Sequence, residues 1–179
     1  MINSTSAQLP REKLLQEQIL LKPIGFVRKT EAGFTVDIKA AFVPALTRVE
    51  DFSHLQVLWW ADRAASPAAR RTLKAGQLFR KGPQQMGIFA TRAPARPNPV
   101  MSSTIQITGV DLETGVIRTP FIDAADGSPV LDIKPYFAME RVQDCQNPDW
   151  CAHWPQWHEE ARLFNWEEEM NLPAGTESR

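Results

Sequence analysis

The sequence predicts a single, mainly β domain with short helices at its edges, and three observations support this. A chain of 179 residues is one ordinary domain, long enough to bury a core without disulfide or metal support. Strand-like apolar runs of a few residues recur along its middle. The 14 prolines favour enforced turns over long helices.

Alternation of apolar and polar side chains predicts the clearest strand, over residues 34–42. Phe34, Val36 and Ile38 alternate with polar residues, which is the pattern of a half-buried strand. Gly33 just before it suits a hairpin turn. Further strands are expected at 24–28, 55–60, 86–90, 103–108, 115–121 and 130–134, and turns containing Gly109, Asp111 and Gly115 separate two of them.

Helices are expected at the edges of this β region. Residues 10–21 have helical apolar spacing, residues 64–73 contain Ser66-Pro67 as a cap and first helical residue, and residues 154–170 form the last helical segment. We therefore expect an N-terminal extension with a short helix over 1–22 and a β domain over 23–140. A Trp-rich, acidic, helical tail over 141–179 is expected to pack on that domain.

Charge is distributed unevenly along the chain, although the formal net charge is only −1. Residues 63–110 hold eight Lys or Arg and no Asp or Glu, whereas residues 140–179 hold nine acidic residues against three basic ones. The basic stretch predicts an anionic partner, with nucleotide phosphates, a carboxylate-bearing ligand and RNA as candidates. The alternative is that Arg70, Arg71 and Lys74 form only the solvent-exposed face of a short helix and bind no partner.

Targeting signals are not evident in the sequence. No apolar run reaches the roughly 18–20 residues that a membrane span needs, and the N-terminus lacks a signal-peptide core. These features predict a cytoplasmic protein.

The segment 87–100, GIFATRAPARPNPV, is the first of two that carry chemical information. Pro94, Pro97 and Pro99 stiffen the loop and hold its side chains in place. Arg92 and Arg96 offer guanidinium groups that bind carboxylate or phosphate in pairs of hydrogen bonds, and Asn98 offers an amide. The alternative is a Pro-rich surface crossover with solvated arginines.

The second segment, DAADGSPVLDIKPY, covers residues 123–136. It places Asp123 and Asp126 in a loop and predicts that Asp132 and Lys134 share a strand face with Val130. Loop carboxylates beside a basic loop can bind ribose hydroxyls or act as bases. Asp126 is the favoured catalytic carboxylate, and the alternative is that it only caps its own turn.

A possible metal site lies in the tail. Cys145, Cys151, His153 and His158 are zinc ligand types, but their spacing departs from the usual Cys-x2–4-Cys pattern. Packing of the tryptophans around them is the simpler interpretation, so no metal is expected.

Both long segments resemble one known family, the TrmO/TsaA-like (YaeB-like) S-adenosylmethionine-dependent tRNA methyltransferases. GIFATRAPARPNPV is similar to its Gly-φ-Phe-Ala-Thr-Arg-Ser-Pro-x-Arg-Pro-Asn-Pro motif, and DGSPVLDIKPY resembles its Asp-Gly-Thr-Pro-Val-φ-Asp-Ile-Lys-Pro-Tyr motif. Supporting matches lie at 23–28 and 51–55, and the resemblance covers roughly residues 23–137.

The resemblance implies a compact β-barrel-like, non-Rossmann domain, usually a homodimer, that binds S-adenosyl-L-methionine. Characterised members methylate N6 of threonylcarbamoyladenosine in tRNA. The matching motif positions imply a site that comprises Asp62, Arg63, Arg92, Asn98, Ser102, Asp123 and Gly127 near the cofactor, with Asp126 and Tyr136 as the catalytic candidates.

Departures from the family pattern concern the acceptor more than the cofactor. The family's Pro-Arg-Gln loop is missing at residues 29–33, and Asp62 stands where a His is usual. The prediction is therefore a tRNA methyltransferase. The alternatives are a methyltransferase acting on a small molecule and a protein that binds the cofactor without transfer.

Overall fold

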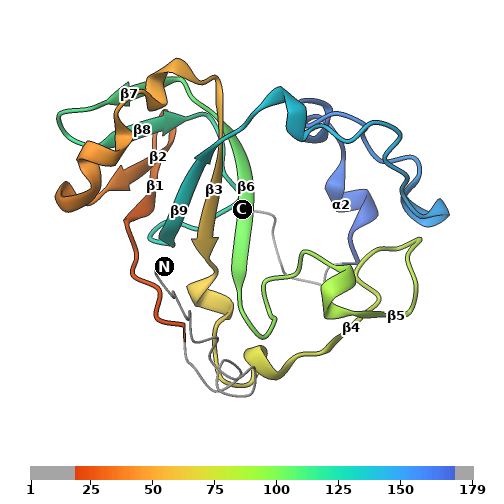
Figure 1. The fold of residues 1–179 in the computed structure, drawn as a ribbon. Coiled ribbons are helices and arrows are strands. Elements are labelled where there is room, and N and C mark those ends of the chain that lie inside the picture. Colours follow the sequence, from red (N-terminus) through yellow and green to blue (C-terminus); the bar gives the residue numbers. More distant parts are fainter. Residues whose placement is uncertain (1–18, 172–179) are drawn as a thin grey trace, which may run out of the picture.

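The computed structural model describes residues 19–171 and contains one seven-stranded antiparallel sheet with strand order β6-β3-β9-β1-β2-β8-β7 (Figure 1). Its strands are β1 (Gly25–Thr30), β2 (Gly33–Ile38), β3 (His54–Trp60), β6 (Val100–Gln106), β7 (Gly109–Asp111), β8 (Val116–Thr119) and β9 (Pro129–Pro135). A separate hairpin pairs β4 (Lys74–Gly76) with β5 (Gln85–Gly87). The predicted mainly β class is confirmed, but in the part described here no ladder joins β6 to β7, so the sheet is open rather than a closed barrel.

The core lies on one face of this sheet and follows the predicted alternation. In β2, Val36 is fully buried and Ile38 is 6% exposed, while Thr35 and Asp37, which alternate with them, are joined by a hydrogen bond from the Thr35 hydroxyl to the Asp37 carboxylate. Fully buried Val, Leu and Ile side chains from the neighbouring strands complete the core, namely Val27, Leu55, Val57, Ile117 and Val130. The strand predicted over 34–42 ends at Ile38, where a 3-10 segment, η1 (Ala40–Leu46), begins.

The predicted facing of residues in β9 is wrong because the strand is irregular. Trp59 pairs with Val130, whereas Leu58 pairs with Asp132, so β9 has one extra residue between these pairs. Such a bulge moves all following side chains to the other face. Ile133 therefore packs on the core, as Val130 does, and Asp132 and Lys134 form an ion pair on the opposite face.

Neither helix predicted within the described region forms as a continuous helix. Residues 64–73 contain only the turns η3 (Asp62–Ala64) and η4 (Ala69–Arg71), although Ser66 Oγ does accept a hydrogen bond from Ala69 N at 3.2 Å. The segment offers mainly alanine methyl groups for burial, which is too little apolar surface to hold a helix. Most of the helix predicted over 10–21 lies outside the described residues.

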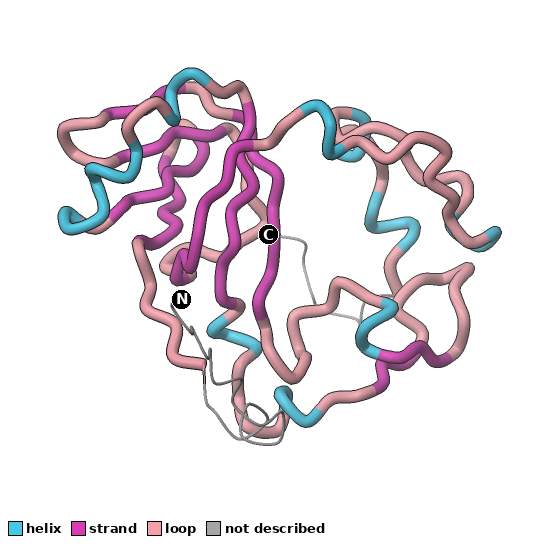
Figure 2. The backbone as a smooth tube through the Cα atoms, in the orientation of Figure 1, coloured by secondary structure: helices cyan, strands magenta, loops and turns pink. Residues whose placement is uncertain are grey.

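The tail is also mostly turns, which Figure 2 shows as loop. It contains η7 (Asp149–Cys151), η8 (Glu160–Arg162) and the single α-helical turn α2 (Trp166–Glu169). The remaining short elements of the chain are η2 (Val49–Asp51), η5 (Ile88–Ala90) and η6 (Ala138–Glu140). None of the helices within residues 19–171 is long and apolar enough to cross a membrane.

An aromatic cluster joins the tail to the loop between β4 and β5. Phe79 in that loop stacks on Trp150 with ring centroids 5.4 Å apart and meets Trp154 edge-on at 4.8 Å. Trp154 in turn contacts Trp166 at 5.2 Å. These contacts hold the tail against the β4–β5 loop, and the segment 154–170 forms short turns there rather than a continuous helix.

Glu169 is the one charged side chain buried in this part of the tail, with 7% of the residue exposed. Its carboxylate accepts hydrogen bonds from His153 Nε2 at 2.7 Å and Trp154 Nε1 at 3.2 Å, and Lys81 Nζ lies 3.8 Å away. The hydrogen bond from His153 is the main reason why the pKa of Glu169 lies below its ordinary value. Glu169 therefore ties the tail to the β4–β5 loop as an ionised group.

This arrangement predicts a pH-dependent stability. A lowered pKa means that the contribution of Glu169 is fully present above the ordinary glutamate pKa of about 4.3, and is lost as the pH falls through the lowered pKa. We expect Glu169→Gln, which cannot ionise, to melt at a lower temperature than the wild type at about pH 7, and the difference to shrink as the pH falls below the ordinary glutamate pKa. Thermal melts of both proteins across this pH range test this, and a difference that persists unchanged in acid would contradict it.

Candidate functional site

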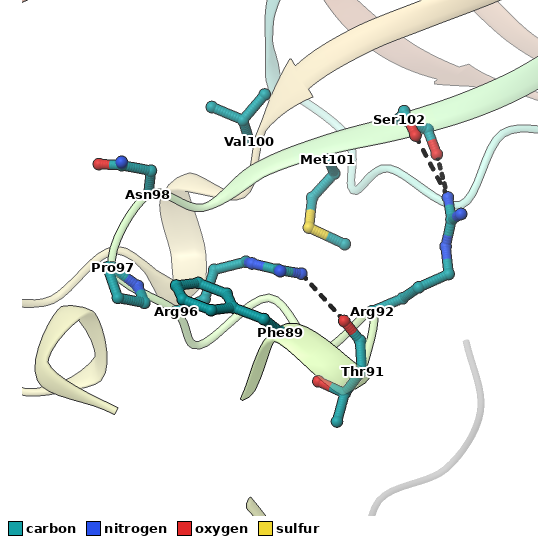
Figure 3. Close-up of a pocket in the computed structure, with 9 residues that line it drawn as sticks. All are labelled: Phe89, Thr91, Arg92, Arg96, Pro97, Asn98, Val100, Met101 and Ser102. Carbon is teal, nitrogen blue, oxygen red and sulfur yellow. Dashed lines mark hydrogen bonds between the residues drawn. The ribbon is translucent and has the colours of Figure 1, made fainter. Parts of the chain in front are cut away.

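The Pro-rich loop 87–100 presents its two arginines differently (Figure 3). Arg92 reaches back to edge strand β6, where its Nη2 donates to Ser102 O at 2.6 Å and to Ser102 Oγ at 3.3 Å. Arg96 turns into its own loop, with Nη1 donating to Thr91 O at 3.2 Å and its guanidinium 6.0 Å from the Phe89 ring centre. Arg92 remains exposed, so its other N–H groups are available to a ligand.

Two pockets adjoin at the Arg92–Ser102 pair. The first, of about 350 Å³, lies within the loop and is lined by Phe89, Thr91, Arg92, Arg96, Pro97, Asn98, Val100, Met101 and Ser102. The second, of about 600 Å³, lies along β6 and is lined by Arg92, Ser102, Ser103, Thr104, Pro120, Phe121, Ile122, Asp123, His158, Ala161, Arg162 and Trp166. Both volumes fall in the range of small-molecule sites. Two ligands bound side by side would meet at Arg92 and Ser102.

A short relay of hydrogen bonds holds Asp123 in the second pocket. Trp59 Nε1, which is buried, donates to Ser103 Oγ at 2.8 Å, and Ser103 Oγ donates to Asp123 Oδ1. Asp123 itself is exposed, so its second carboxylate oxygen remains accessible. The loop carboxylate is thus oriented from the core while it stays open to a ligand.

The predicted site residues fall into two groups. Arg92, Asn98 and Ser102 line the first pocket, and Arg92, Ser102 and Asp123 line the second. Sequence reasoning placed these four residues on three separate segments, and the structure brings them together.

The second group surrounds Asp126 and lines neither pocket. Asp126 Oδ1 accepts the backbone N–H of Lys29 at 2.9 Å, and Arg63 Nη2 donates to the Asp126 carbonyl at 3.0 Å. Gly127 has a positive φ of 85° and donates its N–H to Val27 O at 2.9 Å, so the turn is fastened to β1. Asp62 is exposed at the start of η3, next to Arg63.

Tyr136 also lies away from the pockets. It directly follows β9, is half-buried, and donates its backbone N–H to His54 O at 3.0 Å. Neither pocket includes it. The geometry therefore favours a structural role for Asp126 and leaves the catalytic roles of Asp126 and Tyr136 as predictions.

Sequence reasoning missed the residues that the tail contributes to the second pocket, namely His158, Ala161, Arg162 and Trp166. The sequence pattern suggests His158 only as a possible metal ligand and Trp166 only as a packing residue. Arg162 carried a usable signal, because it is one of three basic residues in the acidic segment 140–179. A basic residue in an acidic segment points to a specific anionic contact more strongly than one basic residue among many does.

The four zinc-type residues have different surroundings. Cys151 is buried, and desolvation raises the pKa of its thiol, whereas Cys145 is exposed. His153 binds Glu169, and His158 lines the second pocket. Across residues 19–171 the structure holds no cluster of three or more His, Cys, Asp or Glu side chains suited to a metal ion.

Comparison with known proteins gives consistent matches. Residues 22–140 match the tRNA-methyltransferase O N-terminal domain family. An S-adenosyl-L-methionine-binding protein of Archaeoglobus fulgidus is 30% identical over 132 residues, which cover 66% of this chain and 89% of that protein. A probable S-adenosyl-L-methionine-binding protein of Methanothermobacter thermautotrophicus is 33% identical over 135 residues, which cover 67% and 91%.

Two further relatives are named for tRNA modification. A tRNA (adenine(37)-N6)-methyltransferase of Eikenella corrodens is 42% identical over 72 residues, or 40% of this chain and 41% of that enzyme. The crystal structure of TrmO from Pseudomonas aeruginosa superposes with a TM-score of 0.56 at 28% identity, and the match covers 74% of this chain and 63% of that one. The long motifs, the matched residues and the fold agree, and the chain belongs to the tRNA-methyltransferase O N-terminal domain family.

Proposed function

We propose that this protein is an S-adenosyl-L-methionine-dependent methyltransferase that modifies N6 of an adenosine in tRNA. The observation that carries the proposal is the meeting of Arg92, Ser102 and Asp123, from three separate segments, around two adjoining pockets in a domain of this family. A transferase needs this arrangement because donor and acceptor must lie side by side and in line. The relatives named as binding proteins and as a tRNA methyltransferase support the same class of activity.

The residues at the junction fit the cofactor's chemistry. S-adenosylmethionine supplies an activated methyl group on a sulfonium, together with a carboxylate, an ammonium and ribose hydroxyls. Arg92 has unused guanidinium N–H groups for the carboxylate, and Asn98 in the first pocket offers an amide for polar groups. The backbone of the loop is stiffened by proline, so these groups are held in place before binding.

The acceptor nitrogen must lose a proton during transfer, which requires a nearby base or an oriented acceptor group. We assign this role to Asp123, because its carboxylate lies in the second pocket and is oriented by Ser103. Asp126, Arg63 and Gly127 then support transfer indirectly, by fastening the loop that carries Asp123. Asp126 itself is the competing candidate for the base.

The exposed basic residues of 63–110 support a nucleic-acid acceptor. Within the described chain, Arg71 and Lys74 are exposed, and their side chains have no hydrogen bond or ion pair. Arg70 is not merely solvated, since it donates to Pro97 O at 2.9 Å and lies 5.6 Å from the Trp60 ring centre. This basic surface can follow a phosphate backbone.

Finer parts of the proposal rest on the family resemblance. They are threonylcarbamoyladenosine as the modified base, a homodimer, a cytoplasmic location, and residues 23–140 as the methyltransferase domain with 141–179 as an added tail. The matched family segment of 22–140 supports that division of the chain.

Binding and transfer can be measured separately. We expect calorimetry to show binding of S-adenosylmethionine and S-adenosylhomocysteine, and labelled methyl to pass to unfractionated tRNA from a strain that lacks this enzyme. Affinity for tRNA should fall steeply with salt. No binding of either cofactor form would end the proposal. Transfer to a metabolite extract but not to tRNA would favour a small-molecule enzyme, and binding without any transfer would favour a cofactor-binding protein.

A further inference from the structure

One wall of the second pocket comes from outside the family domain. The family match ends at residue 140, yet Arg162 and Trp166 of the tail line this pocket opposite β6 and the 120–123 segment. The tail is held there by the aromatic contacts around Phe79 and by the buried Glu169. The wall is therefore built from this chain's own tail, and contacts with Phe79, Trp154 and His153 outside the pocket hold it in place.

The chemistry of this wall is aromatic and cationic. The indole N–H of Trp166 already donates to Ala161 O at 2.8 Å, so what the ring can still offer a ligand is its apolar surface. Its position is set by edge-on contacts with Trp154 at 5.2 Å and Phe164 at 4.9 Å. In the part of the chain that the structure describes, the Arg162 guanidinium has no hydrogen bond or ion pair, and its donors are free for an anion.

We propose that Arg162 and Trp166 form the acceptor-binding wall of the site, which takes a planar base next to an anionic group. The inference rests on the proposed function, because it needs a methyl acceptor. Arg92 and Ser102 lie on the β6 side of the pocket, where the proposed function places the cofactor. In-line transfer puts the acceptor on the far side of the methyl group, which is the side that the tail supplies. Aromatic rings stack on any nucleobase, and a guanidinium binds a carboxylate or a phosphate.

The test uses the full chain with Arg162→Gln, and Arg141→Gln as a matched control. Arg141 is an exposed arginine of the same tail that lines neither pocket, so both changes remove one charge from the same segment. With unfractionated tRNA as the probe, we expect Arg162→Gln to raise KM for tRNA about 10-fold or more, with the Kd for S-adenosylmethionine within about twofold of wild type. Arg162→Lys should restore part of the loss, and Arg141→Gln should behave as wild type.

The outcomes separate this inference from the proposed function. If the wild type transfers methyl to tRNA but Arg162→Gln has the KM of Arg141→Gln, the inference alone fails. It also fails if Arg162→Gln weakens cofactor binding instead, because the wall would then belong to the cofactor. If the wild type neither binds the cofactor nor transfers methyl, both fail. Short oligonucleotides with and without a carboxylate-bearing adenosine distinguish the two anions. If Arg162 binds the carboxylate, Arg162→Gln should raise KM only for the oligonucleotide that carries it. If Arg162 binds a phosphate, KM should rise for both oligonucleotides.

Discussion

Replacing Arg92 with alanine is expected to weaken S-adenosylmethionine binding by about 10- to 100-fold, which corresponds to the loss of a charged hydrogen bond. Arg92 is held between the loop and β6 by its bonds to Ser102, with its remaining donors open at the junction of the two pockets. Titration calorimetry of both proteins with S-adenosylmethionine and S-adenosylhomocysteine measures the effect. Both forms should lose similar affinity, because each carries the carboxylate.

Two further variants make this result specific. Arg71→Ala removes an exposed arginine from the same basic stretch but from neither pocket, so it should leave cofactor affinity unchanged. Arg92→Lys keeps the charge but not the planar fork of donors, and an intermediate affinity is expected. Equal affinities for wild type and Arg92→Ala, in proteins with equal melting temperatures, would remove Arg92 from the cofactor site.

The second large effect is expected from a matched pair of carboxylates in one loop. Asp123→Asn should slow single-turnover transfer about 10²-fold or more, as is typical for loss of a general base. Asp126→Asn should keep a nearly normal rate, because Asp126 lines neither pocket and an Asn oxygen can still accept the Lys29 N–H. Both rates are measured at saturating cofactor, so that altered binding does not contribute.

Stability measurements complete the comparison. Asp126→Ala removes the acceptor for Lys29 N–H and is expected to lower stability by about 1 kcal/mol, whereas Asp126→Asn is not. The reverse pattern, with a full rate in Asp123→Asn and a slow rate in a stable Asp126→Asn, would restore the assignment that the sequence alone favours.

The class of fold, most strands and the family are all predictable from the order of residues alone. Alternation in β2 predicts its buried face because side chains on a strand point to opposite sides in turn. The two long motifs are specific enough to predict the family, since Arg, Asn, Asp and Pro at so many set positions rarely coincide. The family resemblance also names Arg92 and Ser102, which the structure places at the junction of the two pockets, and their role toward the cofactor stays a prediction.

Which residues face each pocket depends on contacts between distant parts of the folded chain. The bulge in β9 reverses the expected facing of Asp132 and Lys134, and no local pattern marks it. The segments 64–73 and 154–170 form short turns rather than continuous helices, and their contacts with distant residues, such as Arg70 with Pro97 and Trp154 with Phe79, exist only in the folded chain. The Asp123 and Asp126 side chains, three residues apart, point to different places because Asp123 accepts a hydrogen bond from Ser103 and Asp126 accepts one from the Lys29 N–H. Side-chain direction in turns depends on partners far along the chain, and these exist only once the chain has folded.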